Sequence, residues 1–162
     1  MTIDSREFRD ALGRFATGVT IITTRDGRGE PVGITANAFA SLSLDPPLVL
    51  FNLNRRAYSL NAFLGARHFA VNILEVGQEG LSSAFANALS EKWDGVDYET
   101  WDTGAPILNG CLTNLECRLH ETHEGGDHLI MVGRVLKIRM DRHGEPLLYF
   151  GSRYCRLEPV ER

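Results

Sequence analysis

Short β-branched runs that end at glycine-containing turns restrict the fold of this chain more than any other feature. Residues 19–24 read Val-Thr-Ile-Ile-Thr-Thr, a turn with two glycines follows at 26–29, and residues 32–35 supply a returning run. Residues 111–122 and 128–140 flank Gly125 and Gly126 in the same way. Such runs joined by tight glycine turns are typical of β-hairpins. The sequence therefore predicts antiparallel strand pairs in both halves of the chain.

Further strands are predicted at residues 48–53, 68–74 and 146–150, which are rich in apolar and aromatic side chains. The first of these runs follows Pro46 and Pro47. Proline is tolerated just before a strand but not inside a central one, so this placement is consistent with a strand start.

Helices are few in this sequence. Apolar residues recur at helical spacing behind two candidate caps, Asp4 and Ser5, at Phe8, Ala11, Leu12 and Phe15. We expect this stripe to pack on the sheet. Residues 58–64 predict a second helix, and residues 80–89 predict a third through the spacing of Leu81, Ala84, Phe85 and Ala88. Residues 90–110 have no clear period. Because strands dominate and most are joined by hairpins, we expect a mainly β protein, an antiparallel barrel with a few helices outside it.

Length and charge limit the classes of protein to consider. A chain of 162 residues fits one domain, which we expect to span 1–162. The net charge of −4 provides no basic excess for the phosphates of a nucleic acid. No apolar run approaches the roughly 20 residues of a membrane span. Residues 1–10 contain no apolar signal region, so we expect a soluble, cytoplasmic protein without a membrane or nucleic-acid partner.

Several common catalytic and binding motifs are absent from the sequence. Cys111, Cys117 and Cys155 contain no C-x-x-C pair, so small, buried or half-buried apolar side chains are favoured over a disulfide framework or a zinc site. Neither G-x-G-x-x-G nor a P-loop is present. His120 and His123 lie an odd number of residues apart on a predicted strand and so point to opposite faces, which argues against a metal site. No nucleophile, base or paired carboxylates stand out, which fits chemistry supplied by a cofactor.

Residues 35–43 are the first candidate binding segment. They read Thr-Ala-Asn-Ala-Phe-Ala-Ser-Leu-Ser, with small and hydroxylated side chains where a buried strand would use bulky ones. Small side chains let a flat ligand approach the backbone, whose amide groups can pair with a heterocycle. The alternative is a polar strand end that turns toward residues 45–47.

Two polar clusters are further candidates. Cationic and hydroxyl groups follow the predicted strand at 48–53 and suit an anionic phosphate, namely Asn52, Asn54, Arg55, Arg56 and Ser59. His128 follows a Gly-Gly-Asp turn that would present its imidazole at the mouth of the barrel. The alternative for both clusters is a solvated surface.

Taken together, these segments resemble the flavin reductase-like family, whose members are FMN-binding split-barrel proteins that include reductase components of monooxygenases. The resemblance runs from Phe8 to Leu157. It is carried by the order and spacing of segments 15–24, 35–43, 45–49, 69–74, 126–128, 133–135 and 146–150. The resemblance implies an antiparallel split β-barrel.

The resemblance also implies which residues bind cofactors. By similarity, the isoalloxazine and ribityl groups of FMN or FAD lie along Thr35, Ala36, Asn37, Ala38, Ser41, Leu42 and Ser43. The strand with Phe51, Asn52 and Leu53, and then Ser59, continues toward the phosphate, and Phe85 and Ala86 close over the flavin. NADH or NADPH is expected at His128 and at Tyr149, Phe150 and Gly151. No general acid, general base or metal ligand is implied.

The implied activity is hydride transfer from NAD(P)H to flavin, with the reduced flavin supplied to a partner monooxygenase. We also expect a homodimer, since an open barrel mouth leaves apolar surface and an incompletely enclosed flavin for a twofold partner to cover. The alternative class is a split-barrel electron carrier or haem-binding module without NAD(P)H turnover. A reductase of corrin-bound cobalt is a narrower option among the enzymes.

Overall fold

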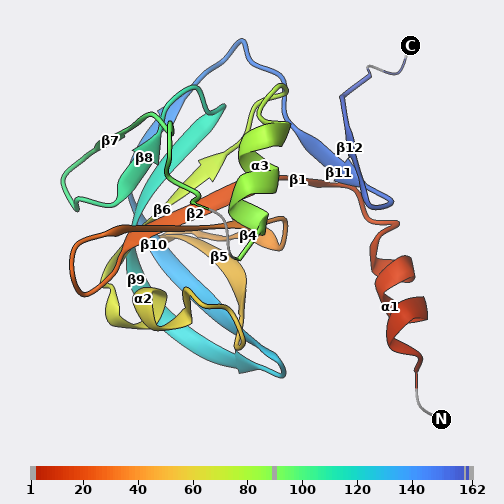
Figure 1. Ribbon diagram of the computed structural model, residues 1–162, viewed down its shortest axis with the longest axis horizontal. Helices are drawn as coiled ribbons and strands as arrows, with labels where there is room; N and C mark the ends of the chain where they lie inside the picture. Colours follow the sequence, from red (N-terminus) through yellow and green to blue (C-terminus); the bar gives the residue numbers. More distant parts are fainter. Residues whose placement is uncertain (1–2, 89–90, 159, 161–162) are drawn as a thin grey trace.

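The computed structural model describes residues 3–88, 91–158 and 160. Its elements, in chain order, are α1 (Ser5–Leu12), β1 (Thr17–Gly18), β2 (Thr20–Arg25), β3 (Pro31–Ala36), β4 (Phe39–Leu44), β5 (Pro47–Asn54), α2 (Leu60–Gly65), β6 (His68–Ile73), α3 (Glu79–Ala86), β7 (Tyr98–Thr100), β8 (Pro106–Leu108), β9 (Thr113–Gly125), β10 (His128–Met140), β11 (Leu148–Phe150) and β12 (Arg153–Cys155). Strands form most of the fold, and the helices lie outside the main sheet (Figure 1).

The main sheet has seven strands in the order β3-β2-β6-β9-β10-β5-β4, and every neighbouring pair is antiparallel. Its two edge strands are consecutive in the chain, because β3 ends at Ala36 and β4 begins at Phe39. The sheet must therefore curl until its edges approach each other at Asn37 and Ala38. No described ladder joins β3 to β4, so the predicted antiparallel barrel is confirmed in its split form.

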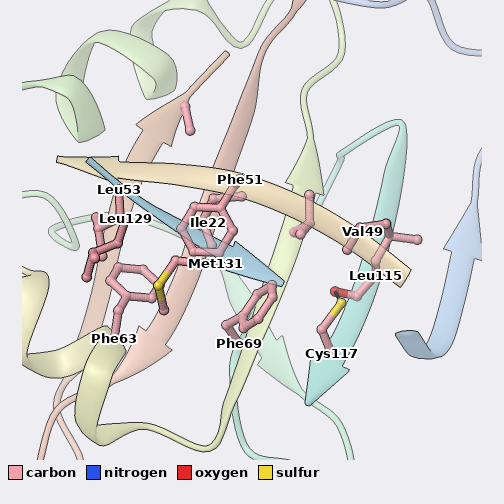
Figure 2. Packing of buried hydrophobic residues seen from close by; sticks show 12 residues of the cluster. Ile22, Val49, Phe51, Leu53, Phe63, Phe69, Leu115, Cys117, Leu129 and Met131 are labelled. Carbon is pink, nitrogen blue, oxygen red and sulfur yellow. Dashed lines mark hydrogen bonds between the residues drawn. The ribbon is translucent and has the colours of Figure 1, made fainter. Parts of the chain in front are cut away.

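The interior of the curled sheet holds the main hydrophobic core. Phe51 of β5 is fully buried and meets Phe63 and Phe69 edge to face, with ring centroids 5.7 and 5.2 Å apart. Figure 2 shows these rings beside Met131 and Leu53. Aromatic pairs in this arrangement add stabilisation beyond the area that they bury.

The strand β2 is buried on both faces. Ile22 packs into the interior core, whereas Ile21 belongs to an outer cluster with Phe85 of α3 and Leu108 of β8. Buried threonine hydroxyls need acceptors, and Thr23 Oγ1 donates to the carbonyl of Pro106 at 2.5 Å. The outer layer of α3 and the β7–β8 pair thus explains why this run is continuously apolar and β-branched rather than alternating.

The N-terminal helix differs from expectation in its packing. Asp4 caps α1, with its carboxylate accepting from the backbone N–H groups of Arg6 and Glu7. However, no residue of α1 is buried, and Phe8 and Leu12 remain 54% and 59% exposed. In Figure 1 this helix stands away from the main sheet. The prediction that its stripe packs on the sheet of the same chain is therefore wrong.

Other differences concern element boundaries and short strands. The predicted second and third helices begin and end within a few residues of α2 and α3, and Leu89 lies outside the described residues. The aperiodic stretch at 90–110 contains β7 and β8, and β1 and β12 were also not predicted. Strands of two or three residues are too short to show a period of two.

Three remaining expectations concern membranes, metals and thiols. In the described part of the chain no helix has the length and apolar character needed to cross a membrane. The same residues contain no cluster of histidine, cysteine, aspartate or glutamate that suits a metal ion. Cys111 and Cys117 are buried free thiols and Cys155 is a half-buried one, as predicted.

Candidate functional site

A cavity of about 1180 Å³ lies where β3, the end of β5 and the C-terminal half of α3 meet. Ten of the predicted site residues line it: Thr35, Ala36, Asn37, Ala38, Asn52, Leu53, Ser59, Phe85, Ala86 and His128. The structure therefore brings segments 35–38, 52–59, 85–86 and the turn at 128 into one site. A volume of this size is enough for a nucleotide cofactor.

The strand β3 and the turn after it form the wall with small side chains. Ala36 is 9% exposed and lines the cavity, and Asn37 and Ala38 follow it as exposed residues. The hydroxyl of Thr35 donates to the carbonyl of Ser82 in α3 at 2.6 Å, so it fixes the helix to this wall. The backbone along this wall remains close to the cavity, as the sequence predicts for a planar ligand.

Phe85 of α3 forms an aromatic part of the cavity wall and lies directly against β3. A Cβ atom at Gly33 would be 2.4 Å from Phe85 Cε1, so only glycine lets the ring approach this strand. Trp93 holds the ring from the other side, edge to face at 5.0 Å between centroids. Phe85 is 1% exposed, which makes it a fixed wall rather than a mobile side chain.

A polar end of the cavity is formed by the last residues of β5 and the turn that follows it. Asn52, Asn54, Arg56 and Ser59 line it, whereas Arg55 does not. The Ser59 hydroxyl is buried and has no hydrogen-bond partner. A buried hydroxyl normally has a partner, so an unpartnered one on a cavity wall fits a site for a ligand oxygen such as a phosphate or ribityl hydroxyl.

His128 begins β10 at the cavity mouth. Its Nδ1 lies 2.8 Å from the Asp127 carboxylate. The hydrogen bond and the charge of the imidazole lower the pKa of Asp127 below its usual range. With Nδ1 engaged by the carboxylate, Nε2 is the nitrogen left for a ligand.

Lys92 and Trp93 line the cavity but were missed in the sequence, because they fall in the aperiodic stretch before β7. The Lys92 ammonium donates to the carbonyl of Phe85 at 3.1 Å and to that of Gly33 at 3.4 Å, bridging the two walls. Partial burial lowers the pKa of this lysine. The adjacent cationic and aromatic side chains of Lys92 and Trp93 were the signal in the sequence that could have indicated a binding site.

The charges around the cavity have both signs. Arg56 and Lys92 are the cations of its lining, and Asp26, Glu91 and Asp94 are the acids. Asp26 turns inward on its own loop, where its carboxylate accepts from the backbone N–H groups of Arg28 and Glu30, and these bonds lower its pKa. The lining is therefore not uniformly positive. Arg56 is a cation among the residues at the polar end that includes Ser59.

Seven predicted site residues do not line this cavity. Phe51 lies in the interior core, and the edge strand β4 carries Ser41, Leu42 and Ser43 away from the cavity lining. Tyr149, Phe150 and Gly151 belong to the β11–β12 hairpin, where the Arg14 guanidinium lies 4.8 Å from the Phe150 ring and the Gly151 amide donates to the Gly13 carbonyl. This hairpin meets α3 through Tyr154 and Ser82, whose hydroxyls are 2.8 Å apart.

The fold and the cavity together define a class: a mainly β protein whose cavity is large enough for a nucleotide cofactor and is lined by a strand of small residues and by Phe85. The comparison with protein families agrees with this class. The family model described as flavin reductase like domain matches residues 12–158, and the chain belongs to that family.

Relatives with curated names are similar over nearly the whole chain. The flavin-dependent monooxygenase reductase subunit HsaB of Rhodococcus jostii is 42% identical over 97% of this chain and 80% of its own length. The FMN reductase (NADH) SmoA of Agrobacterium fabrum is 43% identical over 94% of this chain and 86% of its own.

A solved structure adds a similar fold. The NADH:FAD oxidoreductase SgcE6 of Streptomyces globisporus, in complex with NAD and FAD fragments, superposes with a TM-score of 0.90. It is 37% identical, and the match covers 98% of each chain. The resemblance inferred from the sequence motifs is thus confirmed.

Proposed function

We propose that this protein is an NAD(P)H:flavin oxidoreductase that reduces FMN or FAD and supplies the reduced flavin to a partner monooxygenase. The observation that carries the proposal is that one cavity contains both the small-residue wall expected for flavin and His128, expected for the nicotinamide nucleotide. The names of SmoA and SgcE6 support reduction of FMN or FAD by NADH, and the name of HsaB supports a partner monooxygenase.

The residues of the cavity fit a flavin. The wall of Thr35, Ala36, Asn37 and Ala38 would hold the ring, and Ser59 with Arg56 would receive the phosphate. The buried Ser59 hydroxyl has no hydrogen-bond partner in the protein, so a phosphate oxygen would satisfy it. A flavin in this cavity would supply the hydride acceptor, which explains why the chain needs no general acid or base.

The protein contributes order and an apolar environment to this reaction. Thr35 and Lys92 donate to carbonyls of α3, and Lys92 also donates to the carbonyl of Gly33, so these bonds hold α3 against β3. A rigid cavity wall lowers the entropic cost of bringing the flavin and nicotinamide rings together. Phe85 and Trp93 make the inner side apolar, and there the Lys92 charge would favour added negative charge.

His128 would contact the nicotinamide nucleotide from the cavity mouth. Its Nε2 is free of the Asp127 bond and can donate or accept there according to its protonation. Tyr149, Phe150 and Gly151 remain predictions from the resemblance for the same nucleotide, and Ser41, Leu42, Ser43 and Phe51 for the flavin.

We also propose a single domain over 1–162 that functions as a homodimer. Apolar side chains remain exposed on the outer surface, including Leu44 at 95%, Ile138 at 62% and Leu12 at 59%. Exposed apolar groups on several elements are typical of an interface between subunits. Cytoplasmic localisation follows from the same proposal, because the electron donor NAD(P)H is a soluble metabolite.

The test is an anaerobic mixing experiment. Purified protein, flavin and NADH or NADPH are combined without oxygen, and the absorbance of oxidised flavin is followed. We expect catalytic bleaching, with many flavin molecules reduced per protein. An electron carrier or haem module would instead bind its cofactor without turnover, and a rate equal to that of flavin and nucleotide alone would overturn the proposal.

A further inference from the structure

Arg55 makes three contacts with the turn that carries His128. Its backbone N–H donates to the Asp127 carbonyl at 3.0 Å, and its Nε donates to the Gly126 carbonyl, also at 3.0 Å. Its Nη2 pairs with the Glu124 carboxylate. The three bonds reach consecutive parts of one turn, at the tip of the β9–β10 hairpin (Figure 1).

The neighbouring arginine has a different environment. Arg56 lines the cavity, whereas Arg55 points away from its lining and toward the hairpin. The sequence alone does not distinguish the two adjacent arginines as candidates for phosphate binding. In the structure, Arg56 lines the cavity and can contact a ligand, whereas the three contacts of Arg55 are all with the β9–β10 hairpin. Arg55 therefore needs an explanation other than phosphate binding.

The turn itself has little stiffness of its own. It contains Gly125 and Gly126, and Gly126 adopts a φ of +72°, in the region that favours glycine. Adjacent glycines give a chain many accessible conformations, so the position of the next residues depends on outside contacts. Asp127 and His128 are those next residues, and the Asp127 side chain in turn orients the imidazole.

We propose that Arg55 is a positioning residue for the nicotinamide site, which restrains the turn so that His128 faces the cavity. Arg55 touches neither cofactor and acts only through the turn. The inference rests on the proposed role of His128, and it adds a residue that neither the motifs nor the cavity lining indicates. A rigid fork that bonds a carbonyl and a carboxylate together suits this task better than a single point charge.

The first experiment compares Arg55→Gln with the parent enzyme. We expect kcat/KM for NADH to fall by about 3- to 10-fold, because part of a charge-assisted hydrogen bond is lost at a half-exposed site. The loss should lie mainly in KM, and the flavin dissociation constant should stay unchanged. Arg55→Lys can satisfy one partner at a time and should recover part of the loss.

Two matched variants separate the contacts. Glu124→Gln removes the ion pair but leaves the Nε bond, and its carboxylate is 80% exposed, so we expect less than about a twofold change. Arg56→Gln removes the same charge one residue away and should give the reverse pattern, raising the flavin dissociation constant more than KM for NADH.

The double variant with His128→Ala decides the mechanism. If Arg55 acts through His128, Arg55→Gln should cost nothing further once the imidazole is gone. Losses that multiply, or an Arg55→Gln variant with parental KM while His128→Ala is impaired, would overturn the inference. If His128→Ala has parental kinetics, the proposed nucleotide contact fails first, and the inference fails with it.

Discussion

The Gly33→Ala substitution tests the aromatic wall of the cavity with a single methyl group. The new Cβ would lie 2.4 and 2.6 Å from two carbons of the Phe85 ring, whereas carbon atoms at rest are about 3.5–4.0 Å apart. The ring would have to move by roughly 1 Å, and it is 1% exposed with Trp93 behind it. Overpacking of this kind costs about 1–3 kcal/mol of folding free energy.

Phe85 lines the cavity, so part of the strain should appear in ligand affinity. If about 1–2 kcal/mol is expressed there, the flavin dissociation constant rises by about 5- to 30-fold. Flavin fluorescence quenching measures that constant, and urea denaturation measures the folding free energy in the same preparation.

Gly133→Ala is the matched control, because its Cβ would lie 2.2 Å from Cζ of Phe69 in the interior core. It should lower stability by a similar amount and leave flavin affinity as in the parent, since neither residue lines the cavity. Unchanged flavin affinity in Gly33→Ala, or an equal loss in both variants, would refute the assignment of Phe85 as a cavity wall.

Three further predictions concern the nucleotide, the thiols and the subunits. His128→Ala should lower kcat/KM for NAD(P)H by about 3- to 100-fold with little change in flavin binding, which steady-state oxidation and fluorescence quenching measure together. Burial raises the pKa of Cys111 to about 11 and that of Cys117 to about 12. As pH rises, these thiols lose their protons in the unfolded chain before they do so in the folded chain. The free energy of unfolding should therefore fall above about pH 9, by about 1 kcal/mol per thiol at pH 10. Denaturation curves measured as a function of pH should show a smaller fall for Cys117→Ala than for the parent. Light scattering should give twice the mass of one chain, and Leu44→Glu should shift it toward the monomer; a monomeric parent would disprove the dimer.

The parts of the fold that local chemistry decides were predictable. The glycines of the 26–29 and 125–126 turns predicted hairpins, and the structure has β2–β3 and β9–β10 there. The periodicity of Phe8 and Leu12 predicted a helix correctly but not its partner surface, because a stripe shows that a face is apolar and not what covers it.

The candidate site was predictable from the sequence where consecutive residues line the cavity. It was harder to predict where tertiary contacts bring distant residues to the cavity. The segment 35–43 was identified from its small side chains; its residues 35–38 line the cavity, whereas Ser41, Leu42 and Ser43 do not. Phe51 is buried in the interior core, whereas its neighbour Asn52 points to the other face, is exposed and lines the cavity. Leu53 shares the inward face of Phe51 but lies nearer the end of β5, and it also lines the cavity. Lys92 reaches the site through a stretch without period, so only the folded chain brings it there.

No residue of α1 is buried within its own chain. If the proposed homodimer covers this helix, the order of residues 5–12 depends on protein concentration. A helix of eight residues with one good cap is too short to persist alone in water, where about 12–15 residues are needed for marginal helicity. In the proposed homodimer, the partner subunit would supply that order by covering Phe8 and Leu12. Far-ultraviolet circular dichroism of this segment, and its resistance to proteases, should therefore fade together as the protein is diluted, while the curled sheet keeps its signal.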